Sequence, residues 1–350
     1  MRRVGVLLAV LAALAVLSVT AGAGRPGSLL EAPPNTARAG HLQTDSGMYK
    51  RTRELLPQRF MDYETKRFIV LSDAAPGWSR KQAALLDRTY HQFKRFARRL
   101  GIKPKPLRHK LVCVLFQEHE DYRRFARTRD GVTADWISGY YSPKNDRIVF
   151  YNIETNPDFA EAIQVSESAE RIAKVEGHTP AARGRLREEY QKAAIATVVH
   201  EAVHQLSFHT RIQSPQIQNP LWLSEGLATA FETDRPNRSF GPDHVYDLRE
   251  EQFTELLDAG KLIPLRELVT YSNMPDNEDD TIAAVYHQSY SLVTWMCRFR
   301  KSQMRDFLAA LRSERPGRPS ARRQLQIFEK AFGKVGAVEK AWLRHVEGKK

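Results

Sequence analysis

The stretch "TVVHEAVHQL", residues 197–206, decides how the rest of the chain is interpreted. Two histidines, His200 and His204, stand four residues apart, and Glu201 directly follows the first of them. Residues 185–208 around them are rich in good helix formers and carry an apolar stripe, which predicts a helix. Residues four apart lie on one face of a helix, so both imidazoles can point at one ion. The alternative is an ordinary amphipathic helix that carries three polar residues.

The spacing of the two histidines fits a zinc site. Zn²⁺ takes histidine nitrogens at about 2.0–2.1 Å in a tetrahedral arrangement. Glu201 is too close in sequence to act as a third ligand, but its carboxylate can take a proton from the attacking water, as in the HExxH motif. A surface helix with the same residues would show the same pattern, so a second feature must decide between the two interpretations.

That second feature is "NPLWLSEGLATAFE", residues 219–232. A helix is expected to begin at Pro220. Glu225 follows His204 after an intervening segment of twenty residues, 205–224. A solvated acidic helix face does not explain a glutamate among leucines, a tryptophan and a phenylalanine, because a carboxylate in that setting needs a partner. Gly226 beside it lets two helices approach closely, and Glu232, seven residues on, is expected on the same helical face.

Together, "HEAVHQ" and "WLSEGLATAFE" resemble the signature of the gluzincin clan of zinc metallopeptidases, in particular its small, secreted, poorly characterised members. The resemblance implies that His200, His204 and Glu225 bind zinc and that Glu201 is the general base. It also implies that Glu232 orients one of the zinc ligands.

A third segment, "YHQSYSLVTWM", is similar to a helix of the same clan whose first tyrosine donates a hydrogen bond to the oxyanion. The resemblance implies this role for Tyr286. Tyr290 lies one turn further along beside leucine and valine, so it is expected in the core. His287 and His209 are rival donors.

Two departures from the well-known aminopeptidases of this clan bear on the activity. The gap to the third ligand is two residues longer, and their Gly-x-Met-x-Asn loop is absent, so an endopeptidase acting on peptide or protein substrates is favoured. "RIVFY", residues 147–151, is either the edge strand that pairs with an extended peptide or an ordinary edge strand. The alternative function is a non-catalytic, zinc-containing envelope binding protein, against which the intact Glu201 argues.

The remaining patterns predict an α+β, zincin-like domain over residues 61–346. Strands are expected in "RFIVLSD" and "KLVCVLF", a hairpin or edge pair in "GYYSPKNDRIVFYN", and a helix over residues 78–100 with Ser79 as its cap. Residues 61–155 form the sheet-containing half and residues 156–346 the helical half, with the zinc cleft between them.

The first residues are interpreted as an export signal. Arg2 and Arg3 precede an apolar run over residues 4–20, which ends in an A-x-A cleavage pattern at residues 21–23. Cleavage there yields a secreted, periplasmic or cell-envelope protein, and an uncleaved membrane anchor is the alternative. Residues 24–60, with Pro, Gly and Ser and little periodicity, are interpreted as an irregular linker.

The net charge bears on the possible binding partners, and the positions of the cysteines bear on disulfide formation. The formal net charge is +13, with the excess clustered in short basic runs. A solvated basic face is favoured over an anionic partner such as a membrane or wall polymer, and no nucleic-acid motif accompanies the charge. Cys113 and Cys297 fall in an expected strand and an expected helix, which predicts two buried thiols rather than a disulfide.

Overall fold

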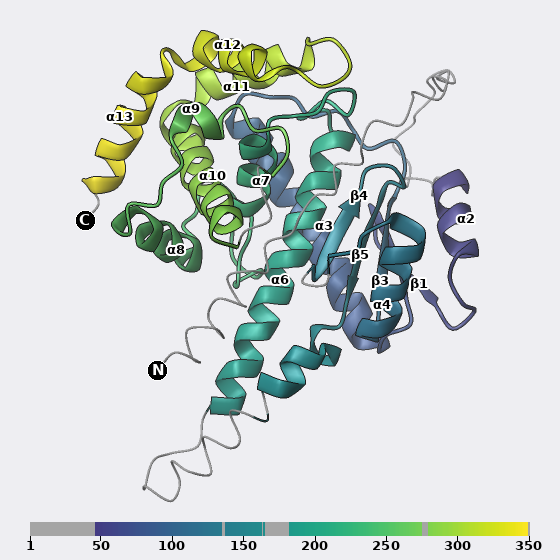
Figure 1. The fold of residues 1–350 in the computed structure, drawn as a ribbon. Helices are drawn as coiled ribbons and strands as arrows, with labels where there is room; N and C mark the ends of the chain where they lie inside the picture. Colours follow the sequence, from purple (N-terminus) through teal and green to yellow (C-terminus); the bar gives the residue numbers. More distant parts are fainter. Residues whose placement is uncertain (1–45, 135–136, 163, 165–181, 275–278, 349–350) are drawn as a thin grey trace, which may run out of the picture.

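A computed structural model of the protein describes residues 46–134, 137–162, 164, 182–274 and 279–348. These residues are α+β, as predicted, with a five-stranded sheet in the first half and mainly helices in the second (Figure 1). The expected export signal, residues 1–23, lies outside the described residues and stays a prediction. Within the described residues, no helix combines the length and apolar character needed to cross a membrane.

The sheet is mixed, with strand order β1-β2-β3-β5-β4. The pairs β2–β3 and β3–β5 are parallel, whereas β1 and β4 add antiparallel strands at the two edges. The strands are β1 Met61–Glu64, β2 Phe68–Ser72, β3 Leu111–Phe116, β4 Gly139–Ser142 and β5 Arg147–Tyr151. The predicted hairpin is confirmed as the antiparallel β4–β5 pair.

The expectation that residues 147–151 form an edge strand is wrong. Strand β5 pairs with β3 on one side and with β4 on the other, and all five of its residues are buried. A short, nearly continuous apolar run bounded by turn residues is typical of a strand buried on both faces. Among the described residues, the outermost strand at this end of the sheet is β4.

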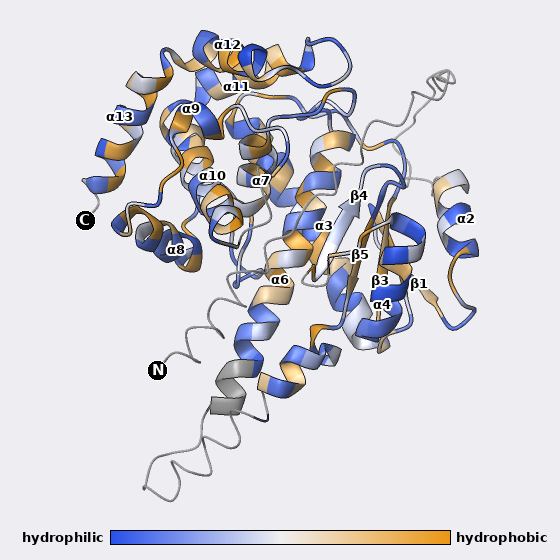
Figure 2. Ribbon diagram, in the orientation of Figure 1, coloured by the Kyte–Doolittle hydropathy of each residue, from blue (hydrophilic) through white to orange (hydrophobic). Residues whose placement is uncertain are grey.

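Both faces of the sheet are covered by helices. Successive strand residues point to opposite faces, so each strand contributes side chains to two cores. Phe68 and Val70 of β2 belong to the main core with helix α3 (Pro76–Arg99), whereas Ile69 and Leu71 belong to a second core with helix α4 (His119–Phe125). A π-helical turn, Ala126–Asp130, follows α4. In Figure 2, strands β3 and β5 are mainly apolar in colour, β4 is paler, and helix α4 is mainly polar.

Two smaller expectations fail in the first half. Helix α3 begins at Pro76 after Ala75, and the Ser79 hydroxyl, inside the helix, bonds the Ser72 hydroxyl at 2.9 Å instead of acting as a cap. Proline suits the first helical position because its missing N–H has no helical partner there. Within the expected linker, Ser46–Glu54 form helix α2, whose Arg53 bonds backbone carbonyl groups of the following turn.

In the second half, helix α10 packs against α7, α8 and α11, and α7 packs against the long helix α6, which also contacts the sheet and α3 (Figure 1). The single turn Ile153–Thr155 leads out of β5. The helices are α6 Ala182–His209, α7 Leu221–Thr229, α8 Asp247–Asp258, α9 Leu265–Leu268, α10 Asp279–Phe299, α11 Lys301–Arg312, α12 Ala321–Phe332 and α13 Val335–Glu347.

Helices α7 and α10 approach each other most closely at Gly226. A Cβ atom at this position would lie 2.5 Å from the carbonyl oxygen of Ser289 and 2.6 Å from Cγ2 of Val293. The predicted need for a residue without a side chain is therefore confirmed. The two cysteines are also as expected, since both are buried and neither forms a disulfide.

Candidate metal centre

Helix α6 carries the first three residues of the site. Residues 187–195 of this helix are mostly exposed or half-buried, apart from the buried Tyr190, and its second half is buried in the main core through Val199, Val203 and Leu206. Figure 2 shows the corresponding change from polar to apolar along the helix. The turn that bears His200 and His204 therefore lies where the sheet half and the helical half meet. The spacing of these apolar residues determines which side of the helix packs into the core. The two imidazoles project together from this buried part of the helix.

Three side-chain atoms converge at this turn. Oε2 of Glu225, from α7, lies 3.3 Å from Nε2 of His200 and 3.6 Å from Nε2 of His204. These separations are longer than a usual N–H···O hydrogen bond of about 2.9–3.0 Å. Two ligands at about 2.0–2.1 Å from a tetrahedral zinc would lie about 3.3–3.4 Å apart. The separations of Glu225 from the two imidazoles are thus close to those expected between two ligands of one zinc ion.

Glu201 lies beside this triangle in a different environment. Its Oε2 accepts a 2.5 Å hydrogen bond from the backbone N–H of Tyr141 on β4. Among the described residues, Oε1 of Glu201 is buried and finds no hydrogen-bond donor. Burial raises the pKa of this carboxyl to about 8. One oxygen of Glu201 is therefore held by the sheet edge, and the other is available to a ligand.

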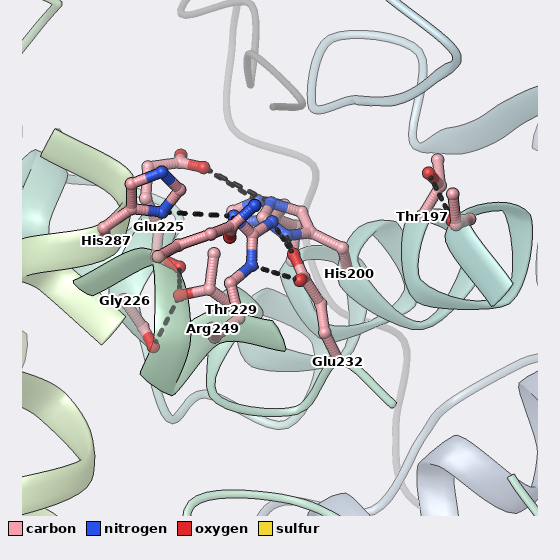
Figure 3. A network of polar contacts seen from close by, with 11 residues as sticks. Thr197, His200, Glu225, Gly226, Thr229, Glu232, Arg249 and His287 are labelled. Atoms are coloured by element: carbon pink, nitrogen blue, oxygen red, sulfur yellow. Dashed lines mark hydrogen bonds and ion pairs between the residues drawn. The ribbon is translucent and has the colours of Figure 1, made fainter. Parts of the chain in front are cut away.

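A buried ion pair supports the far side of His200 (Figure 3). Nδ1 of His200 lies 2.8 Å from Oε1 of Glu232, and Arg249 on α8 grips both oxygens of that carboxylate at 2.7 and 3.0 Å. A carboxylate on Nδ1 leaves Nε2 unprotonated in the neutral imidazole, which is the form that binds metal. Glu232 therefore lies where it can fix the tautomer of His200.

Glu232 reaches this position by a different route from the one expected. Helix α7 ends at Thr229, so Glu232 does not share a helical face with Glu225. The Thr229 hydroxyl bonds the carbonyl oxygen of Glu225 at 2.7 Å within the last turn, and the chain then leaves the helix. Glu232 approaches His200 from the segment that follows.

Three carboxylates lie at the centre, those of Glu201, Glu225 and Glu232, and the Arg249 guanidinium pairs with Glu232. Without a cation, protons balance the remaining charge. The raised pKa of Glu201 favours its neutral form. Burial opposes protonation of His200, but Glu225 and Glu232 outweigh it and raise its pKa to about 10. Burial opposes ionisation of Glu225, but His204 and His200 outweigh it and hold its pKa at about 2. A divalent ion would replace the protons on Glu201 and His200.

Tyr286 lies against the same triangle. This tyrosine of α10 is fully buried, its ring centre is 6.2 Å from that of His200, and its hydroxyl is hydrogen-bonded to Glu225. Burial, followed by the nearby Glu225 and Glu201, raises the pKa of the hydroxyl well above its usual value, so it stays a donor. Tyr290 is a core residue, as expected, and its hydroxyl contacts Tyr246 and Glu250 instead.

Neither rival donor shares the contacts of Tyr286. Nδ1 of His287 lies 3.4 Å from the Arg249 guanidinium (Figure 3), and burial together with that charge lowers the pKa of His287 to about 3. His209, the last residue of α6, lies 2.8 Å from Asp146 at the β4–β5 turn. Both histidines therefore have other partners.

Access to the centre is restricted. None of the five residues His200, Glu201, His204, Glu225 and Tyr286 is more than 2% exposed. A hollow of about 780 Å³ lies further along α6, between it and α3, and residues such as Trp78, Gln191 and Asn237 line it rather than the site residues.

Two contributors to the site were not predicted. Arg249 lies in a helix rich in charged residues, where nothing in the local pattern distinguishes a buried arginine from a solvated one. The other contributor is the backbone N–H of Tyr141, which carries no side-chain signal at all.

Comparison with known proteins adds one finding. A family model described as "Protein of unknown function (DUF1570)" matches residues 194–317, a segment that includes all the candidate site residues from His200 to Tyr286. No curated protein matches the chain. The chemistry of the site is therefore what indicates a function.

Proposed function

We propose that this protein is a zinc-dependent peptidase of the gluzincin type, with a zincin-like fold, that cleaves peptide bonds within exported polypeptides or in the cell envelope. The observation that carries the proposal is the convergence of His200, His204 and Glu225, in which Glu225 lies close to zinc-ligand spacing from both imidazoles. The free oxygen of Glu201 supports it. When bound, zinc acidifies water and polarises a carbonyl group.

The side chains around the ligands divide the remaining chemistry. Glu201 takes the proton of the attacking water on Oε1 and later passes it to the leaving amine. Tyr286 donates its hydroxyl hydrogen to the oxygen of the scissile carbonyl as charge develops there. Glu232, held by Arg249, keeps His200 oriented. Glu201 and Tyr286 would act on the substrate, whereas Glu232 and Arg249 would act through His200.

The edge strand offers a site for an extended peptide. Among the described residues, no strand pairs with the outer edge of β4, and the N–H of Tyr141 on this strand lies beside Glu201. A polypeptide that adds to this edge would bring its backbone next to the base and the ligands. This pairing favours internal cleavage of an extended chain over removal of a terminal residue.

A second candidate function is a non-catalytic, zinc-containing binding protein of the envelope. The near-complete burial of the centre favours it, because a buried metal site can serve stability alone. The two functions differ in whether Glu201 has chemistry to perform, since a structural zinc site does not need a general base.

A mixed-sequence peptide library distinguishes the two functions. The zinc-loaded protein is incubated with the library, and new termini are identified by mass spectrometry, with a chelator-treated sample in parallel. The peptidase proposal expects internal cleavage that the chelator abolishes. A protein that holds zinc at His200 and His204 and leaves the library intact would be the binding protein.

A further inference from the structure

A second group of potential metal ligands lies at the end of helix α6. His109, Asp146 and His209 place one ligand atom each within 4.8 Å of one another. The two imidazole rings meet edge to face, with ring centres 5.3 Å apart. Histidine nitrogens and one carboxylate are a common ligand set for zinc and related divalent ions.

The three residues come from separate parts of the fold. His109 precedes β3, Asp146 ends the turn between β4 and β5, and His209 is the last residue of α6. Asp146 has a left-handed backbone (φ 44°), which is uncommon for a residue other than glycine. Its main-chain oxygen accepts a hydrogen bond from Gln205 at 3.3 Å. The turn is thus tied to the same helix that carries the first centre.

This cluster also touches the edge strand. The Tyr141 hydroxyl donates to Oδ1 of Asp146 at 3.0 Å, while the backbone N–H of the same tyrosine donates to Glu201. Tyr141 therefore connects the cluster to the base of the first centre through one residue of β4. An ion that fixed Asp146 would also fix the strand that holds Glu201.

The distances between the potential ligand atoms are further from those of a zinc site than in the first centre. Nε2 of His209 lies 2.8 and 2.9 Å from the two oxygens of Asp146, which is the spacing of an ion pair. Ligands of one zinc would be about 3.3–3.4 Å apart, so these atoms would separate by about 0.5 Å. Both side chains are about one-fifth exposed, at 18% and 21%, so solvent and an ion can reach them.

We propose that His109, Asp146 and His209 form a second, weaker site for a divalent transition-metal ion such as zinc. The ion would fasten the β4–β5 turn to the end of α6. Water would complete its coordination, because the cluster is partly open to solvent. This site does not depend on the function proposed for the first centre.

Metal content measured on two pairs of variants tests the proposal. Tag-free protein is equilibrated with excess zinc, desalted briefly and analysed by mass spectrometry for metal per chain. The expected values are two for the wild type, one for His109→Ala/His209→Ala, and one for His200→Ala/His204→Ala. Zinc lost only with the second pair means that the first centre exists and the proposed second site does not.

Two further measurements keep the result independent of misfolding and of stray binding. Asp146→Asn keeps the size of the side chain, and in a zinc titration it should lose only the weaker of two binding steps. His91→Ala is the matched control, because His91 is an exposed histidine 4.0 Å from Asp87 and outside both clusters. A titration that shows one step in the wild type, or a loss of zinc with His91→Ala equal to that with Asp146→Asn, would overturn the proposal.

Discussion

The two histidine clusters on helix α6 differ in how much of their binding geometry is formed before a ligand arrives. At His200 and His204 both imidazoles lie 3.3–3.6 Å from Glu225, close to zinc-ligand spacing, and are surrounded by protein. At His209 the imidazole and Asp146 have closed on each other as an ion pair near solvent. The first cluster is organised for a cation, and the second is satisfied without one.

Burial explains this difference. Near the surface, water and small movements satisfy a carboxylate and an imidazole whether or not a metal binds. In the interior, three carboxylates beside one guanidinium must be balanced either by protons on Glu201 and His200 or by a bound cation. We therefore expect the first cluster to bind zinc more tightly and to tolerate substitution less well than the second.

The largest expected effect comes from removing the ligand that the two imidazoles share. Glu225→Ala leaves two histidines, so zinc affinity should fall by more than the ~10–100-fold cost of losing a supporting partner, and activity should be lost. Competition with a chromophoric chelator measures the affinity. Asp146→Asn is the comparison variant and should leave this tight step unchanged. An unaltered tight step in Glu225→Ala would exclude Glu225 as a ligand.

The next effect concerns the hydroxyl that touches Glu225. Tyr286→Phe should fold and bind zinc but lose about 10²–10³ in kcat, with KM little changed, because the lost bond forms chiefly in the transition state. Tyr290→Phe removes a hydroxyl whose recorded partners, Tyr246 and Glu250, are outside the site, so its turnover should be nearly normal. Reversed phenotypes would show that the two tyrosines have been assigned the wrong roles.

A smaller effect is expected from the ion pair behind His200. Glu232→Gln keeps the shape of the side chain but removes the charge that Arg249 grips, so zinc affinity should fall about 10–100-fold. Only the tight binding step of the zinc titration, assigned to the first cluster, should weaken. The weaker step at the second cluster should stay unchanged. Equal weakening of both steps would mean that the substitution loosens the whole fold.

The smallest effect concerns packing beneath the first cluster. Gly226→Ala places a Cβ against the Ser289 carbonyl, and overpacking of this kind typically costs about 1–3 kcal/mol of unfolding free energy. Gly336→Ala, in helix α13 with open space around it, should instead stabilise by about 0.5–1 kcal/mol. Urea unfolding of both variants checks the signs. A neutral Gly226→Ala would show that α7 and α10 can separate freely.

Local sequence patterns were enough to predict the main strands and helices. The apolar runs at Phe68–Ser72 and Leu111–Phe116 became strands, and α7 begins at Leu221, directly after Pro220. The spacing of His200 and His204 also predicted a shared helical face, because helix geometry is local.

Tertiary choices were not predictable in the same way. The pairing partners of Arg147–Tyr151 depend on where β3 lies, and the ion pair of Glu232 with Arg249 joins two segments across a turn. The hydrogen bond from the Tyr141 backbone to Glu201 joins residues 60 positions apart and involves no side chain of Tyr141. Nothing in a local sequence pattern records such contacts.

The central claim is that Glu201 acts as a base beside a zinc ion held by His200, His204 and Glu225. The most direct test measures turnover of a cleaved library peptide by wild-type and Glu201→Gln proteins, each with its zinc content determined. We predict equal zinc in both and a loss of about 10²–10⁴ in turnover for the variant, the usual cost of losing general acid–base assistance. Near-normal turnover by zinc-loaded Glu201→Gln, or no cleavage by the zinc-loaded wild type, would contradict the account.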